Sequence, residues 1–191
     1  MKKFFVAMLA MVLLLTACAK ETESASNTES GHPQATSDLE ALETVWALYG
    51  EEQIFPVMGG AMESAVDGKP GQYDMAYKEN LQYDALIPAE LLEYVDTAAT
   101  MVHMMNRNTF TSCALTLNTG MTMEDFALAV RDGIQAQEWM CGFPDLLFVA
   151  SPGDGILVVA YGMVESMGAF TSNFARAWPG AKVFYDEPIG G

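Results

Sequence analysis

The pattern of apolar and polar positions divides this chain of 191 residues into three parts. Residues 4–15 form an unbroken apolar run, and residues 19–37 contain no large apolar side chain. From residue 38 onward, apolar positions recur with the spacing of helices and strands. The remaining length, about 154 residues, is enough to bury one hydrophobic core, so we expect a single domain over residues 38–191.

Two helices are predicted in the first part of this domain. Ser37 and Glu40 form a capping box, and apolar residues recur at helical spacing from there to Gly50. Pro88 is a favourable first residue of a helix, and the apolar residues after it predict a short second helix that ends near Asp96.

Two further segments of this part carry weaker signals. Residues 59–80 are rich in Gly and show little periodicity, which predicts a loop or an irregular excursion. Residues 98–105 fit a strand and an extended apolar loop equally well. Because its two clear signals are helical, we expect residues 38–105 to form an N-terminal helical part of the domain.

Residues 106–191 alternate between strand patterns and helix patterns. Thr122 and Asp125 cap a helix, the turn sequence "PGDG" joins two apolar runs as a hairpin, and Pro179 with Gly180 ends a second helix. The predicted elements are, in chain order, a strand at 110–118, a helix at 122–139, strands at 145–151 and 156–162, a helix at 164–178 and a strand at 181–186.

This β-α-β-β-α-β order predicts an α+β fold in which residues 106–191 form a two-layer, ferredoxin-like core. Because crossover connections are right-handed, both helices would lie on one face of a four-stranded antiparallel sheet. The two hairpin strands are apolar on both faces, so the second face needs cover as well. We expect the extra N-terminal helices to cover it, and a partner protein is the alternative.

The amino-terminal sequence has the features of a bacterial lipoprotein signal. Lys2 and Lys3 precede the apolar run, which is too short to span a bilayer. The residues "LTAC", ending at Cys18, resemble a lipobox, in which small residues precede a cysteine that is diacylated before cleavage on its amino side. This pattern predicts a signal peptide over residues 1–17 and a lipid-modified Cys18 at the start of the mature protein.

An ordinary signal peptide, cut near Ala17 or Ala19, is the alternative. It would leave Cys18 as a stray thiol in an oxidising compartment, which favours lipid attachment instead. Because two or three acyl chains give stable anchoring, Cys18 would hold the protein on the extracytoplasmic side of the cell membrane. Residues 18–37 would then be a disordered tether, since they cannot bury enough apolar surface to offset their ordering entropy.

The chain is strongly acidic, with 9 Lys and Arg against 25 Asp and Glu and a formal net charge of −16. Removal of the two lysines in the signal leaves 7 against 25, a net charge of −18. Such a surface repels nucleic acid and anionic lipid head groups. The partners that remain are the membrane, through Cys18, and an unknown protein or small cationic ligand. Because no acidic run exceeds two residues, solubility outside the cell is the favoured reason for the charge, and a charged partner is the alternative.

Two cysteines lie in the domain, Cys113 on a predicted strand and Cys141 just after a predicted helix. Buried thiol pairs outside the cytoplasm tend to oxidise, and a bond here would close a loop of about 29 residues. In the chain-entropy model that closure stabilises the fold by roughly 3 to 4 kcal/mol. We predict a disulfide between Cys113 and Cys141. Two buried free cysteines, or one redox-active or nucleophilic cysteine, are the alternatives.

The segment "MVHMM" is the one place in the sequence that suits metal chemistry. The thioethers of Met101, Met104 and Met105 and the imidazole of His103 are soft ligands that suit Cu(I). Methionine is also a common filler of hydrophobic cores, and a lone histidine among apolar neighbours usually packs with them. We therefore predict neither a metal site nor a cofactor, and name these four residues as the candidate ligands.

The sequence contains no recognisable catalytic motif. His103 is the only histidine in the predicted domain, and no GxSxG motif surrounds a serine. The spacings of calcium-binding loops and of phosphate-binding loops are missing as well. Non-enzymatic binding or interaction is therefore the predicted function. Soft-metal handling, or an enzyme centred on His103, is the alternative.

Four stretches of the sequence together carry a family resemblance: the lipobox, "IPAELLEYVD" at 87–96, "MVHMMNRNTF" at 101–110 and "LVVAYG" at 157–162. They resemble a family of short bacterial lipoproteins, mostly from Gram-positive anaerobes, classed as domain of unknown function 4358. The likeness covers roughly residues 38–186, and the Gly-rich residues 59–80 and the two domain cysteines depart from it. The resemblance implies a lipid-anchored extracytoplasmic protein and supplies no catalytic residue.

Overall fold

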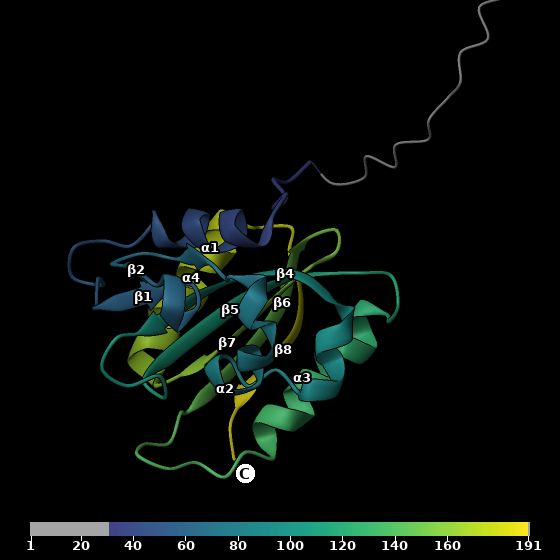
Figure 1. Ribbon diagram of the computed structural model, residues 1–191. Coiled ribbons are helices and arrows are strands. Elements are labelled where there is room, and N and C mark those ends of the chain that lie inside the picture. Colours follow the sequence, from purple (N-terminus) through teal and green to yellow (C-terminus); the bar gives the residue numbers. More distant parts are fainter. Residues whose placement is uncertain (1–30, 191) are drawn as a thin grey trace, which may run out of the picture.

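One sheet of eight strands runs through the molecule (Figure 1). The computed structural model describes residues 31–190. The strand order is β2-β1-β4-β5-β7-β6-β8, with β3 also paired to β4, and neighbouring strands are antiparallel. The strands are β1 (Val57–Gly59), β2 (Val66–Asp67), β3 (Gly71–Gln72), β4 (Val95–His103), β5 (Phe110–Leu117), β6 (Leu146–Gly153), β7 (Ile156–Gly162) and β8 (Lys182–Pro188).

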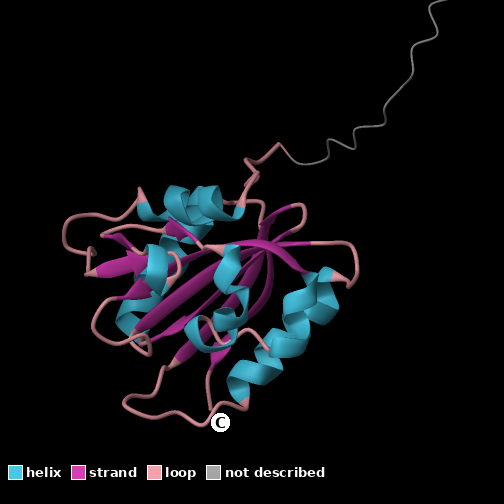
Figure 2. Cartoon of the chain, viewed as in Figure 1, coloured by secondary structure: helices cyan, strands magenta, loops and turns pink. Residues whose placement is uncertain are grey.

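The helices flank this sheet (Figure 2). The α-helices are α1 (Asp38–Trp46), α2 (Leu81–Asp84), α3 (Met123–Gln135) and α4 (Val164–Ala177), and the short 3-10 helices are η1 (Met62–Ser64), η2 (Met75–Asn80) and η3 (Ala89–Tyr94). None of the helices within residues 31–190 is long and apolar enough to cross a membrane. The predicted signal peptide, Cys18 and most of the predicted tether lie outside the described residues.

The helix caps and the hairpin turn that the sequence predicts are present in the structure. The Ser37 hydroxyl accepts a hydrogen bond from the Glu40 N–H at 3.1 Å, and the Thr122 hydroxyl accepts one from the Asp125 N–H at 3.1 Å, so both helix caps are confirmed. The predicted hairpin joins β6 and β7. The protein is therefore an α+β protein with a mostly antiparallel sheet, as predicted.

Alternate residues of the central strands point into two separate hydrophobic clusters. On one face of the sheet, Ala114 of β5 and Val158 of β7 pack with α1 and α4. On the other face, their neighbours Leu115 and Val159 pack with α3 and with the segment that contains α2 and η3. Figure 1 shows α1 and α4 together and α3 apart from them. The sheet is thus covered on both faces, partly by N-terminal elements as predicted.

The ferredoxin-like arrangement is not confirmed, and the prediction that both helices share one face is wrong. The elements follow the predicted order β5-α3-β6-β7-α4-β8, but β8 pairs with β6 at the far edge of the sheet. The β5–β6 and β7–β8 connections each step over one strand toward that same edge, while β5 and β7 are antiparallel. Right-handed crossovers from strands of opposite direction then place α3 and α4 on opposite faces.

The position beside β5 is occupied by β4, which pairs with it from Val95 to Val102. The sequence left residues 98–105 open between strand and loop, and the structure makes most of them part of β4. Strands β1 to β4 all come from residues 38–105. Residues 38–105, predicted as an N-terminal helical part of the domain, therefore contain helices and also half of the sheet's strands.

The Gly-rich residues 59–80 are irregular, as predicted, but they contain the short strands β2 and β3, and β3 pairs with β4 next to β1. Gly59 of β1 and Gly71 of β3 lie so close that a Cβ on Gly59 would be 2.0 Å from the Gly71 nitrogen. Only glycine at both positions lets the two backbones approach in this way. As a result β1 and β3 pair with successive parts of the same edge of β4.

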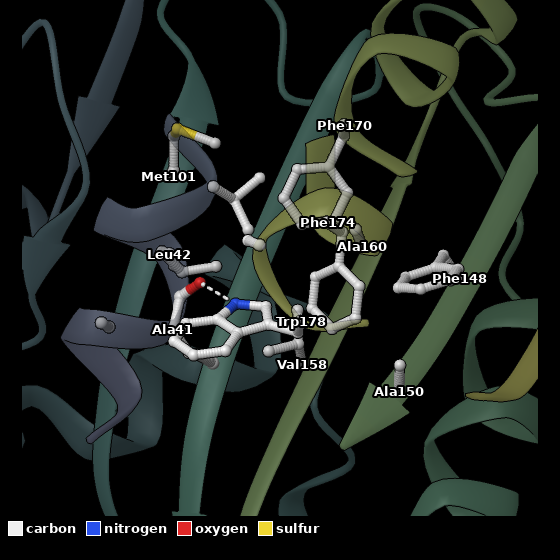
Figure 3. Packing of buried hydrophobic residues seen from close by; sticks show 14 of the residues in the cluster. Ala41, Leu42, Met101, Phe148, Ala150, Val158, Ala160, Phe170, Phe174 and Trp178 are labelled. Carbon is white, nitrogen blue, oxygen red and sulfur yellow. Dashed lines mark hydrogen bonds between the residues drawn. The ribbon is translucent and has the colours of Figure 1, made fainter. Parts of the chain in front are cut away.

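Trp178, just after α4, connects this helix to α1 (Figure 3). Its indole N–H donates a hydrogen bond to the Ala41 carbonyl at 3.1 Å, so the buried polar group is satisfied. Phe174 lies beside it and meets the Phe148 ring edge to face, with 5.0 Å between the ring centroids. These contacts fix α1 and α4 as one layer on the sheet.

The chain enters the domain at the β6–β7 hairpin. Ala35 is buried, and its N–H donates a hydrogen bond to the Pro152 carbonyl at 3.0 Å. A Cβ on Gly153 would lie 2.3 Å from the Ala35 carbonyl oxygen, so glycine permits this contact. The Leu117 N–H donates to the Gly155 carbonyl at 2.8 Å, which brings the end of β5 to the same place. We call this the hairpin end of the sheet.

Truncation of Phe174 tests the layer formed by α1 and α4. Phe174 is 1% exposed, so Phe174→Ala should lower the free energy of unfolding by about 3 to 5 kcal/mol through lost burial and a residual cavity. Leu128→Ala, on α3, removes a side chain that is 45% exposed and should change the free energy by less than about 0.5 kcal/mol. Urea denaturation measures both, and similar losses in the two variants would contradict this packing.

Candidate functional site

Four connections between elements meet at the end of the sheet opposite the hairpin end. β7 finishes there, and its last residue, Gly162, pairs with Phe110 of β5 and Leu146 of β6. In Figure 1 the chain enters beside α1 at the top, and the green connection between α3 and β6 lies at the bottom. We call this surface the loop end; its connections are residues 47–56, 104–109, 136–145 and Met163.

Two asparagine side chains hold the β4–β5 connection against the α3–β6 connection. The Asn106 amide donates to the Cys141 carbonyl at 3.0 Å. The Asn108 amide donates to the carbonyls of Met140 and Gly142 at 2.9 and 3.0 Å. The Asn106 side chain also accepts a hydrogen bond from the Asn108 N–H at 2.9 Å. Both connections are therefore fixed relative to each other by hydrogen bonds between segments far apart in sequence.

The other two connections are joined to the same frame. The Met104 N–H donates to the Pro56 carbonyl at 3.0 Å, and the Met163 N–H donates to the Thr109 carbonyl at 2.9 Å. The Asp145 carboxylate accepts a hydrogen bond from the Val164 N–H at 3.0 Å, which caps the first turn of α4. Side chains on these connections are thus presented on a well-connected backbone.

Among residues 31–190, most of the large apolar side chains that are exposed to solvent gather at the loop end or border it. Met105, Met140 and Phe143 are the most exposed, at 80, 79 and 70%. The Arg107 guanidinium of the loop end also donates to the Tyr83 carbonyl, which brings Tyr83, 66% exposed, to its border. Exposed apolar residues on fixed connections are typical of binding surfaces. The members within the loop end and the start of α4 are Ile54, Met104, Met105, Met140, Phe143 and Val164.

His103, the predicted centre of the alternative functions, is part of this frame. Its Nδ1 accepts hydrogen bonds from the N–H groups of Met105 and Asn106 at 3.2 and 3.3 Å. Its ring stacks on Phe55, with 5.6 Å between centroids and 20° between planes. Because the Nδ1 lone pair faces two backbone donors, the imidazole shapes the β4–β5 connection.

The candidate metal ligands lie in different environments. Met101 is fully buried in the cluster beneath α1 and α4, whereas Met104 and Met105 are 46 and 80% exposed. His103, which lies between Met101 and Met104 in the sequence, is partly buried. Among the described residues, no group of three or more His, Cys, Asp or Glu side chains is arranged to hold a metal ion.

The predicted disulfide is not present: Cys113 and Cys141 are both free. Cys113 faces the cluster beneath α3 and is 1% exposed, and burial raises the pKa of its thiol. Cys141 is exposed on the loop end, where its φ of 62° is unusual for a residue other than glycine. The sequence pattern put both cysteines near the helix that is α3 in the structure. Cys113 lies on the sheet beneath α3, whereas Cys141 lies beyond the end of α3.

A polar network that the sequence did not predict borders the loop end. The Tyr73 hydroxyl donates to the Asp84 carboxylate at 2.6 Å, and the Arg107 guanidinium pairs with the same carboxylate at 3.3 Å. Burial, followed by the hydrogen bond to Asp84, raises the pKa of Tyr73, so its hydroxyl stays protonated and donating. No spacing signal in the sequence links these three residues. The network ties the irregular segment 59–80 and α2 to the β4–β5 connection.

Comparison with known proteins adds no assignment: no family model matches the chain, and no curated protein or solved structure matches it either. The resemblance to domain of unknown function 4358 therefore stays a prediction. The loop end remains the surface whose geometry best fits a function.

Proposed function

We propose that this protein is a lipid-anchored, extracytoplasmic lipoprotein that binds a partner through its loop end. The observation that carries the proposal is the position of two features at opposite ends of the sheet. The chain enters at the hairpin end, where Ala35 contacts Pro152, and the exposed apolar side chains gather at the loop end. A protein attached through its amino terminus would present the loop end away from its attachment.

The sequence before Ala35 supports the anchor. The lipobox places an acylated Cys18 at the mature amino terminus, and residues 19–34 would connect it to the ordered domain. A tether of that length has a mean end-to-end distance on the order of 20 to 25 Å. The domain would therefore stay near the bilayer while its acidic surface is repelled by anionic head groups.

The composition of the loop end supports binding rather than catalysis. Methionine and aromatic side chains are enriched at protein interfaces, and Met105, Met140 and Phe143 are of these types. A catalytic His103 would need an acid or nucleophile within hydrogen-bond reach, but the partners of its Nδ1 are backbone N–H groups. The resemblance to the lipoprotein family, which supplies no catalytic residue, points the same way.

The anchor is tested on the mature amino terminus. Mass spectrometry of the protein from its native membrane should find Cys18 as the first residue, carrying acyl chains. Cys18→Ser should release the protein from the membrane fraction, because acylation requires the thiol. An unacylated first residue, or unchanged membrane retention of Cys18→Ser, would contradict the proposed anchor.

Binding through the loop end is tested by site-specific photo-crosslinking in intact cells. A photoreactive residue in place of Phe143, 70% exposed at the loop end, should form a discrete adduct with a partner. The same residue in place of Asp154, exposed at the hairpin end, is the matched control and should form none. Equal adducts from both positions, or none from Phe143, would contradict the proposed binding surface.

A further inference from the structure

An open hollow lies beside the loop end, between the α1–β1 connection and the first turns of α4. Its volume is about 480 Å³. Ile54 and Phe55 line it on one side, and Glu165 and Gly168 line it on the other, with Glu52 also at the wall. Both carboxylates are exposed, and neither takes part in an ion pair formed by the described residues. The hollow thus combines an apolar wall with two unpaired negative charges.

Gly168 keeps this hollow open. It lies inside α4, where glycine destabilises a helix by roughly 0.5 to 1 kcal/mol relative to alanine. No atom lies within 4 Å of the position that a Cβ would occupy, so packing of the fold does not require glycine there. A side chain at this position would instead project into the space of the hollow.

A long cationic side chain matches this combination of groups. Lysine and arginine bury their hydrocarbon stems along apolar surface while their charged heads stay near polar groups. Here the stem would lie against Ile54 and Phe55, and the head would reach the carboxylates of Glu52 and Glu165. A carboxylate with an arginine or lysine forms a charge-assisted hydrogen bond, stronger than one between neutral groups.

The rest of the loop end also combines negatively charged side chains with exposed apolar ones. Its connections and the start of α4 carry five acidic side chains and one basic side chain, Arg107. Arg107 is already paired with Asp84. The exposed apolar side chains Met105, Met140 and Phe143 share this negative surface. The acidic members are Glu51, Glu52, Glu138, Asp145 and Glu165.

We propose that the loop end binds a basic, amphipathic polypeptide segment, with one lysine or arginine side chain in the hollow between Glu52 and Glu165. The apolar side chains of that segment would cover Met105, Met140 and Phe143. The inference rests on the proposed binding function and names the chemistry of its partner. Nucleic acid, anionic lipid and a second copy of this acidic chain all carry the wrong charge.

The test uses the full chain in nonionic detergent, with carbon-13 methyl-labelled methionine, and a hexapeptide of alternating lysine and leucine as the probe. The peptide should shift the methyl signals of Met105 and Met140 and leave that of the buried Met101 in place. A hexapeptide with glutamate in place of lysine should cause no shift. Absence of shifts with the lysine peptide, or equal shifts with both peptides, would overturn the proposal.

Two variants test the hollow itself. Glu52→Gln with Glu165→Gln should weaken binding of the lysine peptide about fivefold to tenfold, the effect of losing two exposed charge pairs. Gly168→Leu should weaken it similarly without changing the charge, because the new side chain fills the hollow. The control, Glu43→Gln with Asp154→Asn, removes two exposed carboxylates elsewhere and should stay within about twofold.

Unchanged affinity in both the carboxylate pair variant and Gly168→Leu would overturn the assignment of the hollow. An equal loss of affinity in the control would also overturn it, because net charge alone would then explain the weaker binding. Such a result would not by itself contradict the proposed function. If Phe143 still crosslinks to a partner in cells while the lysine peptide does not bind, the loop end is a binding surface for a partner of different chemistry.

Discussion

The apolar character of both faces of strands β5, β7 and β6 is the constraint on which the rest of the structure depends. Each face needs a cover, and the chain supplies it with two right-handed crossovers that leave strands of opposite direction toward the same edge. One crossover helix therefore lies on each face. The N-terminal elements complete both covers, with α1 beside α4 and the segment of α2 and η3 beside α3.

This arrangement also separates the two ends of the sheet. The hairpin end receives the incoming chain at Ala35, and the loop end collects the connections that follow α1, β4, α3 and β7. Hydrogen bonds from Asn106 and Asn108 hold two of those connections together, so the exposed side chains on them would lose little freedom in the proposed binding. The position of the proposed anchor and that of the proposed binding surface thus follow from one topology.

Local signals predicted much of the fold, because caps, turns and apolar periodicity act within a few residues. The capping residues Ser37 and Thr122 and the β6–β7 hairpin are examples. The placement of α4 could not be predicted in this way, since it depends on which strand edge β8 joins. That edge is decided by β4, whose residues 98–103 are mostly apolar, in a pattern that fits more than one structure. The loop end, likewise, brings together residues whose sequence spacing carries no signal.

The most direct test of this account is the distance between the two ends of the sheet. Spin labels on the native Cys141 and on Asp154→Cys, in a Cys18→Ser background, measure it by electron paramagnetic resonance. The eight residues of β6 separate these sites, so the account predicts about 25 Å or more, against a much shorter distance between Cys141 and Met105→Cys. Similar short distances for both pairs would contradict the account, in which the proposed anchor and the proposed binding surface lie at opposite ends of the sheet.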